Sequence, residues 1–269
     1  MRSVRPACLL VALAAALGGC EEPTIEFTET KGIDERLTSQ DVAAVIAVLE
    51  AVGERDRSRL PMPFPPPPGW TEQRSLPVRE LIAEERLALD AAWSPDGAAV
   101  RLPRGMPWDP AVSARRLTRE QFCALVISVA ASLARSAADP DLDLEELARR
   151  GTREIEPLAR DERPFASLPP EERHATRRRA AWVTIAGRAA NLARVPEENL
   201  LLVAEHRERL AKVLPAEFFA DPFAGLYPRP EDHGVPFEEG DLSDAALTWS
   251  AENALIGTDR ADGAARIEE

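Results

Sequence analysis

Residues 118–135 read TREQFCALVISVAASLAR, and this stretch decides the fold. Thr118 and Gln121 have the spacing of a capping box, in which each side chain bonds to the backbone of the other at the start of a helix. The residues that follow are apolar almost all the way around a helix, which is typical of a helix packed by others on most of its sides. The stretch therefore predicts the central helix of a mostly α-helical domain, with Cys123 buried in it. The remaining polar residues form one narrow face and are Gln121, Ser128, Ser132 and Arg135.

Apolar residues at helical spacing predict further helices on both sides of this stretch. These helices are expected over residues 38–53, 78–93, 142–150, 169–192 and 196–214.

The connections between these helices are predicted from turn residues. Ser94-Pro95-Asp96-Gly97 is expected to be a turn, residues 101–110 a loop, and Gly151 the end of a short helix. The break at 194–196 is so short that the last two helices form either an antiparallel hairpin or a kinked pair, and we favour the hairpin.

Composition supports a helical domain and argues against one class of partner. Only 5% of the residues are aromatic, and the chain has 24 prolines but 14 glycines. This composition disfavours a β-sandwich or barrel, whose strands are rich in aromatic residues. The fold class we expect is a mostly α, bundle-like domain with proline-rich connections. A formal net charge of -13 argues against binding to nucleic acid, because a phosphate backbone requires a basic surface.

The first residues, MRSVRPACLLVALAAALGGC, form a secretory signal. Two arginines precede an apolar run of about a dozen residues, which is too short for a spanning helix of about 20 residues. Leu17-Gly18-Gly19-Cys20 at the end of this run resembles the lipobox of bacterial lipoproteins.

This resemblance implies removal of residues 1–19 and acylation of the Cys20 thiol. More than one acyl chain is needed for stable attachment, so a multiply acylated Cys20 would hold the chain on a bilayer without spanning it. In lipoproteins of the enterobacterial type, Asp after the cysteine favours the inner membrane. Here Glu21 follows, which implies secretion across the inner membrane and anchoring at the periplasmic face of the outer membrane.

Charge is unevenly distributed along the rest of the chain. We expect a tether over 20–36, the helical domain over 37–224 and an acidic, extended carboxyl-terminal segment over 225–269. Residues 213–269 contain 13 acids and three arginines, whereas residues 171–194 contain six arginines and two glutamates. This contrast predicts that the acidic segment folds back on the arginine-rich helix.

Two segments are candidate interaction sites. Six prolines lie between residues 61 and 68 and predict an extended polyproline II segment, most simply a stiff spacer across the domain. The alternative is a docking peptide with Phe64 and Trp70 as anchors in a partner's aromatic groove. Arg177, Arg178 and Arg179 predict either a solvent-facing stretch with intramolecular salt bridges or an anion patch for lipid headgroups or a peptidoglycan carboxylate.

The sequence predicts no cofactor and no metal. It has no phosphate-binding loop, dinucleotide fingerprint, nucleophile elbow or zinc-protease histidine pair. Glu171 and His174 are spaced as in di-iron helices but lack a second pair, and His206 is expected in the core. Asp139, Asp141 and Asp143 imitate a calcium loop without its glycine, so we expect at most weak cation attraction there.

These features favour a non-catalytic binding or scaffolding module on the envelope. Its expected partners are the bilayer, through acylated Cys20, and an envelope protein or peptidoglycan. The alternative is a peptidoglycan-cleaving enzyme, because a helical lytic domain can work with a single buried glutamate as general acid. A deep cleft around a desolvated glutamate would favour the enzyme.

Overall fold

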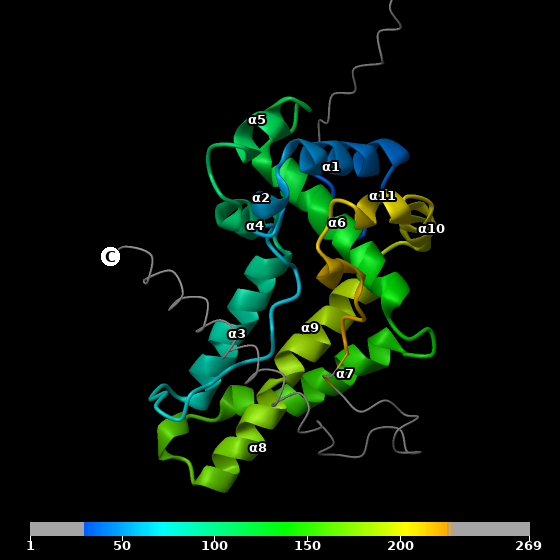
Figure 1. Cartoon of the computed structure of the whole chain (residues 1–269). Helices are drawn as coiled ribbons and strands as arrows, with labels where there is room; N and C mark the ends of the chain where they lie inside the picture. Colours follow the sequence, from blue (N-terminus) through cyan, green and yellow to red (C-terminus); the bar gives the residue numbers. More distant parts are fainter. Residues whose placement is uncertain (1–29, 225, 227–269) are drawn as a thin grey trace, which may run out of the picture.

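The computed structural model describes residues 30–224 and residue 226 (Figure 1). Over these residues the chain is a mostly helical domain of packed helices without β-strands, which confirms the predicted fold class. The signal segment, Cys20 and residues 227–269 lie outside the described residues. The α-helices are α1 (Ser39–Ala51), α2 (Glu54–Arg57), α3 (Val78–Trp93), α4 (Pro95–Arg101), α5 (Trp108–Ser113), α6 (Arg119–Ala137), α7 (Leu144–Ile155), α8 (Pro170–Ala180), α9 (Trp182–Ala193), α10 (Glu197–Glu205) and α11 (Arg207–Ala211). The short 3-10 helices are η1 (Leu158–Arg160), η2 (Phe165–Ser167) and η3 (Ala216–Phe219).

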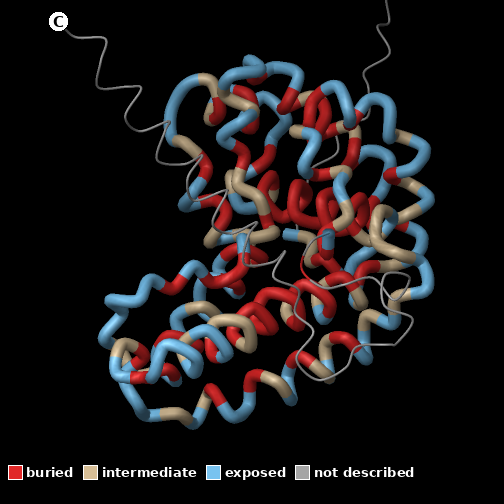
Figure 2. Tube along the Cα trace, turned by 60° about the horizontal axis from the view of Figure 1, so that its bottom comes forward, coloured by how far each residue is buried: buried red, intermediate tan, exposed pale blue. Residues whose placement is uncertain are grey.

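Helix α6 is central, as its sequence predicts. The Thr118 hydroxyl accepts a hydrogen bond from the Gln121 amide at 3.1 Å, and the Gln121 side chain accepts one from the Thr118 amide at 2.8 Å. Every residue from Phe122 to Ala134 is buried. Helices α1, α4, α5, α9 and α10 and η3 all pack against α6, so the core of the domain is built around it (Figures 1 and 2).

The polar face of α6 is covered by the chain that precedes α1. The Ser128 hydroxyl, on a side chain that is almost fully buried, donates to the Gly32 carbonyl at 3.2 Å. Lys31 forms an ion pair with Asp41 of α1 at 2.6 Å, and the buried Asn199 donates to the Glu35 carbonyl at 2.9 Å. Residues 31–36, assigned to the tether from the sequence, therefore lie against the domain.

Helices α1 and α3 form as predicted, but the segment that follows α3 does not. Residues 94–97 were expected to be a turn, and they instead begin a new helix, α4. The Ser94 hydroxyl accepts from the Gly97 amide at 3.4 Å, and Pro95 takes the first helical position, where no N–H is needed. The prediction was wrong because turns and helix starts favour the same residue types.

The predicted loop over 101–110 is also shorter than expected. Helix α5 begins at Trp108, whose side chain is fully buried and packs against Phe122, with ring centroids 6.1 Å apart. Burial of this indole against α6 fixes a helical turn that the surrounding prolines do not predict.

Gly151 does not end α7, which continues to Ile155. A Cβ atom at position 151 would lie 2.6 Å from the Cβ of Ala186 on α9. The glycine therefore permits close packing of α7 on α9, which matters more here than its low helix propensity.

The two long carboxyl-terminal helices are each divided. The first is interrupted at Ala181, between α8 and α9, and the second at His206, between α10 and α11. The favoured antiparallel hairpin is wrong, because α10 packs mainly against α6 rather than along α9. Val203 of α10 is fully buried.

The proline-rich segment crosses the domain as a non-helical strap, which we define as residues 61–70 and call the proline strap. The Phe64 ring packs edge-on against Trp93 of α3, with centroids 5.2 Å apart. Arg188 of α9 donates to the Pro65 carbonyl. The strap thus bridges α3 and α9.

Cys123 provides a test of the buried centre. Its side chain is 2% exposed on α6, and burial raises the pKa of its thiol to about 12. Because the thiolate is the reactive form, this raised pKa leaves very little reactive Cys123 at pH 8. In Cys20→Ser protein without residues 1–19, we expect a thiol reagent to label Cys123 slowly in the native state and rapidly in denaturant. Rapid native labelling would contradict the burial of α6.

Candidate functional site

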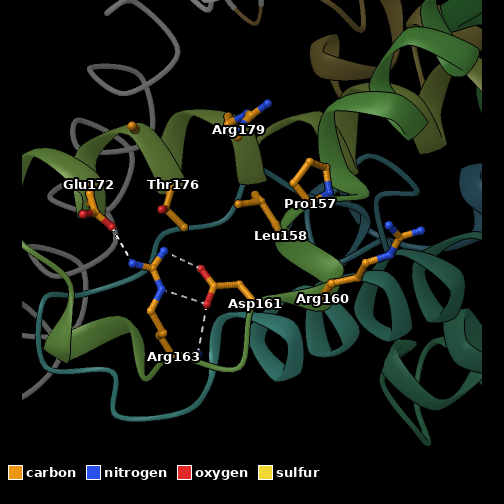
Figure 3. Close-up of a pocket in the computed structure, with 9 residues that line it drawn as sticks. Pro157, Leu158, Arg160, Asp161, Arg163, Glu172, Thr176 and Arg179 are labelled. Atoms are coloured by element: carbon orange, nitrogen blue, oxygen red, sulfur yellow. Dashed lines mark hydrogen bonds and ion pairs between the residues drawn. The ribbon is translucent and has the colours of Figure 1, made fainter.

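A pocket of about 470 Å³ opens between α8 and residues 157–163, the segment that follows α7. Such a volume is within the range of small-molecule sites. Glu172, Thr176 and Arg179 of α8 line one side, and Figure 3 shows Glu172 and Thr176 pointing toward Arg163 and Asp161. The opposite wall includes the Leu158 and Asp161 side chains.

The amino terminus of α3 holds the second wall in place. Helix α3 has Pro77 as its N-cap, with no side chain to satisfy its first amides. Instead, the Val78 amide donates to the Arg163 carbonyl at 3.1 Å and the Arg79 amide to the Asp161 carbonyl at 3.0 Å. The backbone that carries Asp161 and Arg163 is therefore fixed by a helix start distant in sequence.

Arg163 connects the two walls. Its guanidinium donates to both carboxylate oxygens of Asp161, at 2.9 and 3.1 Å, and to Glu172 of α8 at 2.8 Å (Figure 3). These hydrogen bonds hold the pKa of Asp161 below and that of Arg163 above its usual range. The triad has a formal charge of -1 and makes this end of the pocket slightly acidic.

The other end of the pocket is basic. Arg179 is half-exposed and pairs through Nε with Glu154 at 3.3 Å. Arg160, also on the pocket rim, pairs with Glu156. A small polar ligand could place an anionic group at Arg179 and an amine or hydroxyl toward Asp161 and Glu172.

The predicted run Arg177, Arg178 and Arg179 does not form one free anion patch. All three side chains are half-buried on α8. Arg177 lies 3.9 Å from Glu72 and Arg179 pairs with Glu154, as the interpretation with intramolecular salt bridges requires. Of the three, Arg179 lines the pocket.

Phe64 and Trp70 are not exposed partner anchors. Trp70 is 3% exposed, its ring packs edge-on against Phe165, and its indole N–H donates to Glu85 at 2.8 Å. Phe64 is half-buried between Trp93 and Arg188. Both aromatic side chains fasten the proline strap to its own domain, which corrects the docking-peptide interpretation.

Glu85 on α3 is the candidate for the single buried catalytic glutamate that the enzyme alternative requires. Burial raises the pKa of its carboxyl, which is half-buried under the strap. One carboxylate oxygen, however, accepts the Trp70 indole N–H. Glu85 also lies outside the pocket on α8 and outside a second pocket of about 280 Å³ beside residues 31–34. The alternative of a peptidoglycan-cleaving enzyme therefore gains no support from Glu85.

No known protein family, curated protein or solved structure matches this chain.

The remaining candidate residues do not converge on a metal site. Glu171 and His174 are exposed on α8, His206 lies at the break between α10 and α11, and Asp143 caps α7. Among residues 30–224 and 226, no group of three or more histidine, cysteine, aspartate or glutamate side chains is arranged to hold an ion. Within the same residues, no helix is both long and apolar enough to cross a membrane.

Sequence reasoning missed the polar groups that organise the pocket. Asp161 and Arg163 sit in a charged connection of ordinary composition, and no motif distinguishes them. Their arrangement depends on the amides of α3, more than 80 residues earlier in the chain. Only the arginine run gave a signal, and it pointed to one wall of the pocket through Arg179.

Proposed function

We propose that this chain is a lipid-anchored bacterial envelope protein whose helical domain is a non-catalytic binding or scaffolding module. The observation that carries the proposal is Leu17-Gly18-Gly19-Cys20 at the end of an apolar signal. The thiol of Cys20 is the acylation site. Because Glu21 rather than Asp follows it, the proposed location is the periplasmic face of the outer membrane.

The start of the described domain supports an anchor close by. From Cys20 to Thr30 the chain advances ten residues, which reach at most about 35 Å when fully extended. From Lys31 onward the backbone lies against α1 and α6. The anchor would therefore hold the domain near the bilayer surface.

The pocket on α8 supports a binding role. Its walls are fixed by the Arg163 triad and by the amino terminus of α3, so the polar groups are held in place before a ligand arrives. A carboxylate of a peptidoglycan peptide has the charge that Arg179 would accept. In this proposal the pocket positions a ligand and performs no chemistry on it.

Acylation is tested by Cys20→Ser in a bacterial host supplied with labelled fatty acid. We expect the native chain to incorporate label and to sediment with membranes, and the variant to lose both properties almost completely. Cys8→Ser is the matched control, because Cys8 lies within the segment to be removed and its loss should change neither result. Label retained in the Cys20→Ser chain would show that the lipobox interpretation is wrong.

A further inference from the structure

The corner formed by α4, α5 and their connecting loop exposes apolar and basic side chains together. Val100 at the end of α4 is 77% exposed, and Met106 in the loop before α5 is 82% exposed. Arg104, Arg115 and Arg116 are exposed in the same stretch. Residues 99–120 contain five arginines and two acids, a formal net charge of +3 in a chain of net charge -13.

A partly exposed network of hydrogen bonds joins the elements of this corner. Arg119 of α6 pairs with Asp109 of α5 at 2.5 Å and donates to the carbonyls of Ala99, at 3.1 Å, and Pro103, at 3.1 Å. Asp109 also accepts from the Gly105 amide at 2.7 Å. One acid of the stretch is thereby neutralised, and the loop that carries Met106 is fixed between the ends of two helices.

The exposed arginines lie at both ends of one short helix. Arg104 precedes α5, while Arg115 and Arg116 follow it, and a helix of six residues is only about 9 Å long. None of these three arginines forms an ion pair within the part of the chain that the structure describes. Arg104 is near enough to Asp109 to help lower the pKa of its carboxyl, and the exposed charges of Arg115 and Arg116 are available to a partner. We call Val100, Arg104, Met106, Arg115 and Arg116 the α5 corner.

The α5 corner lies at the end of the domain where the chain connects to Cys20. Lys31 binds Asp41 of α1, and α1 packs directly on α5 (Figure 1). Helix α8, whose residues line the pocket, lies at the opposite end (Figure 1). A bilayer that holds acylated Cys20, at most about 35 Å of chain before Thr30, is within reach of the α5 corner.

We propose that the α5 corner is a membrane-contact surface, which rests on anionic phospholipid headgroups while the pocket on α8 points away from the bilayer. The inference rests on the proposed lipid anchor, which brings this end of the domain to the membrane. Attachment at a membrane surface combines arginines, which bind anionic headgroups, with exposed apolar side chains beside them, which enter the bilayer interface. The net negative charge of the chain opposes this membrane contact only weakly, because charges more than about 8 Å from the membrane surface are screened at physiological salt.

The test uses the chain from residue 20 onward with Cys20→Ser, so that acylation plays no part. Binding to phosphatidylcholine vesicles is measured by sedimentation with and without added phosphatidylglycerol. We expect binding to the anionic vesicles that weakens as salt rises. Replacement of Arg104, Arg115 and Arg116 by Gln should weaken it about 100-fold at low salt, since each arginine near an anionic surface contributes about fivefold.

The matched control replaces Arg86, Arg149 and Arg153 by Gln. These arginines are exposed on α3 and α7, outside the pocket and outside the α5 corner, and their replacement changes the net charge equally. We expect the control to bind like the parent chain. Equal weakening by both sets, or equal binding to vesicles with and without phosphatidylglycerol, would overturn the proposed surface.

A second measurement locates the contact. A polarity-sensitive dye on Ser113→Cys, exposed at the end of α5, should shift to shorter wavelength on anionic vesicles, and a dye on the exposed Thr152→Cys of α7 should not. Buried Cys123 does not compete for the dye. A shift at position 152 instead would show that another face meets the membrane. Fatty-acid labelling reports the anchor separately, so failure of acylation and failure of this surface are distinguishable.

Discussion

Replacement of Gly97 by Ala is expected to lower the free energy of unfolding by about 3 kcal/mol. Gly97 is in the first turn of α4, where the chain turns back against α3. A Cβ atom there would lie 2.1 Å from the carbonyl oxygen of Ala91 and 2.9 Å from its carbonyl carbon. Both are backbone atoms of α3, so no side-chain rotation can relieve the overlap, and the two helices must separate.

Thermal and denaturant unfolding measure this effect, which corresponds to a fall in Tm of roughly 6 to 12 °C for a domain of this size. Gly69→Ala is the matched control, because a Cβ atom at position 69 would have no neighbour within 4 Å. We expect the control to be neutral or slightly stabilising, since alanine restricts the unfolded chain. A Gly97→Ala protein as stable as the parent would contradict the close contact of α3 and α4.

Local sequence patterns predict some helices of this fold and miss others. Helices α1, α3 and α6 could be predicted because each carries its own apolar spacing, and α1 and α6 also have capping boxes. Such signals are local. They require no knowledge of which helix lies next to which.

Glycine and serine at the helix ends were ambiguous for a physical reason. Ser94 can start a turn or cap a helix, and Gly151 can end a helix or admit a close neighbour. The neighbours decide between these roles, and they come from elsewhere in the chain: Trp182 and Ala186 meet Gly151. No local pattern at position 151 contains that information.

The candidate site was less predictable than the fold for the same reason. A run of three arginines is visible in the sequence, but the partners of Arg177 and Arg179 are Glu72 and Glu154, which lie far apart in the chain. The arginines without an ion pair among the described residues instead include those of the α5 corner, and these do not form a run of three in the sequence. A run of charged residues therefore indicates that a segment lies at the surface. Whether its side chains are free to bind an anion depends on their ion pairs in the folded domain.

Arg188→Ala is the second change for which we expect a large loss of stability, about 3 kcal/mol. Arg188 is 5% exposed on α9 and donates to the Pro65 carbonyl of the proline strap and to the Pro222 carbonyl near the end of the described chain. No carboxylate pairs with it within residues 30–224 and 226, and burial lowers its pKa to about 10. Its removal leaves a cavity under Phe64 and two carbonyls without this donor.

Arg188→Met separates the two contributions, because methionine fills much of the volume but donates no hydrogen bond. Burial of a cation is itself unfavourable, and the Nε atom of Arg188 has no acceptor, so the hydrogen bonds must exceed that penalty to stabilise the domain. We expect Arg188→Met to lose about half as much stability as Arg188→Ala.

Trypsin provides an independent measure, because the exposed Arg59 and Arg74 flank the proline strap. Release of the strap in Arg188→Ala should accelerate cleavage at both sites, while cleavage at Arg149, on the exposed side of α7, should change little. If Arg188→Met is as stable and as protease-resistant as the native protein, the two carbonyl contacts contribute nothing net. The strap would then be held by the packing of Phe64 and Trp70 alone, and Arg188 would serve only to fill space beside it.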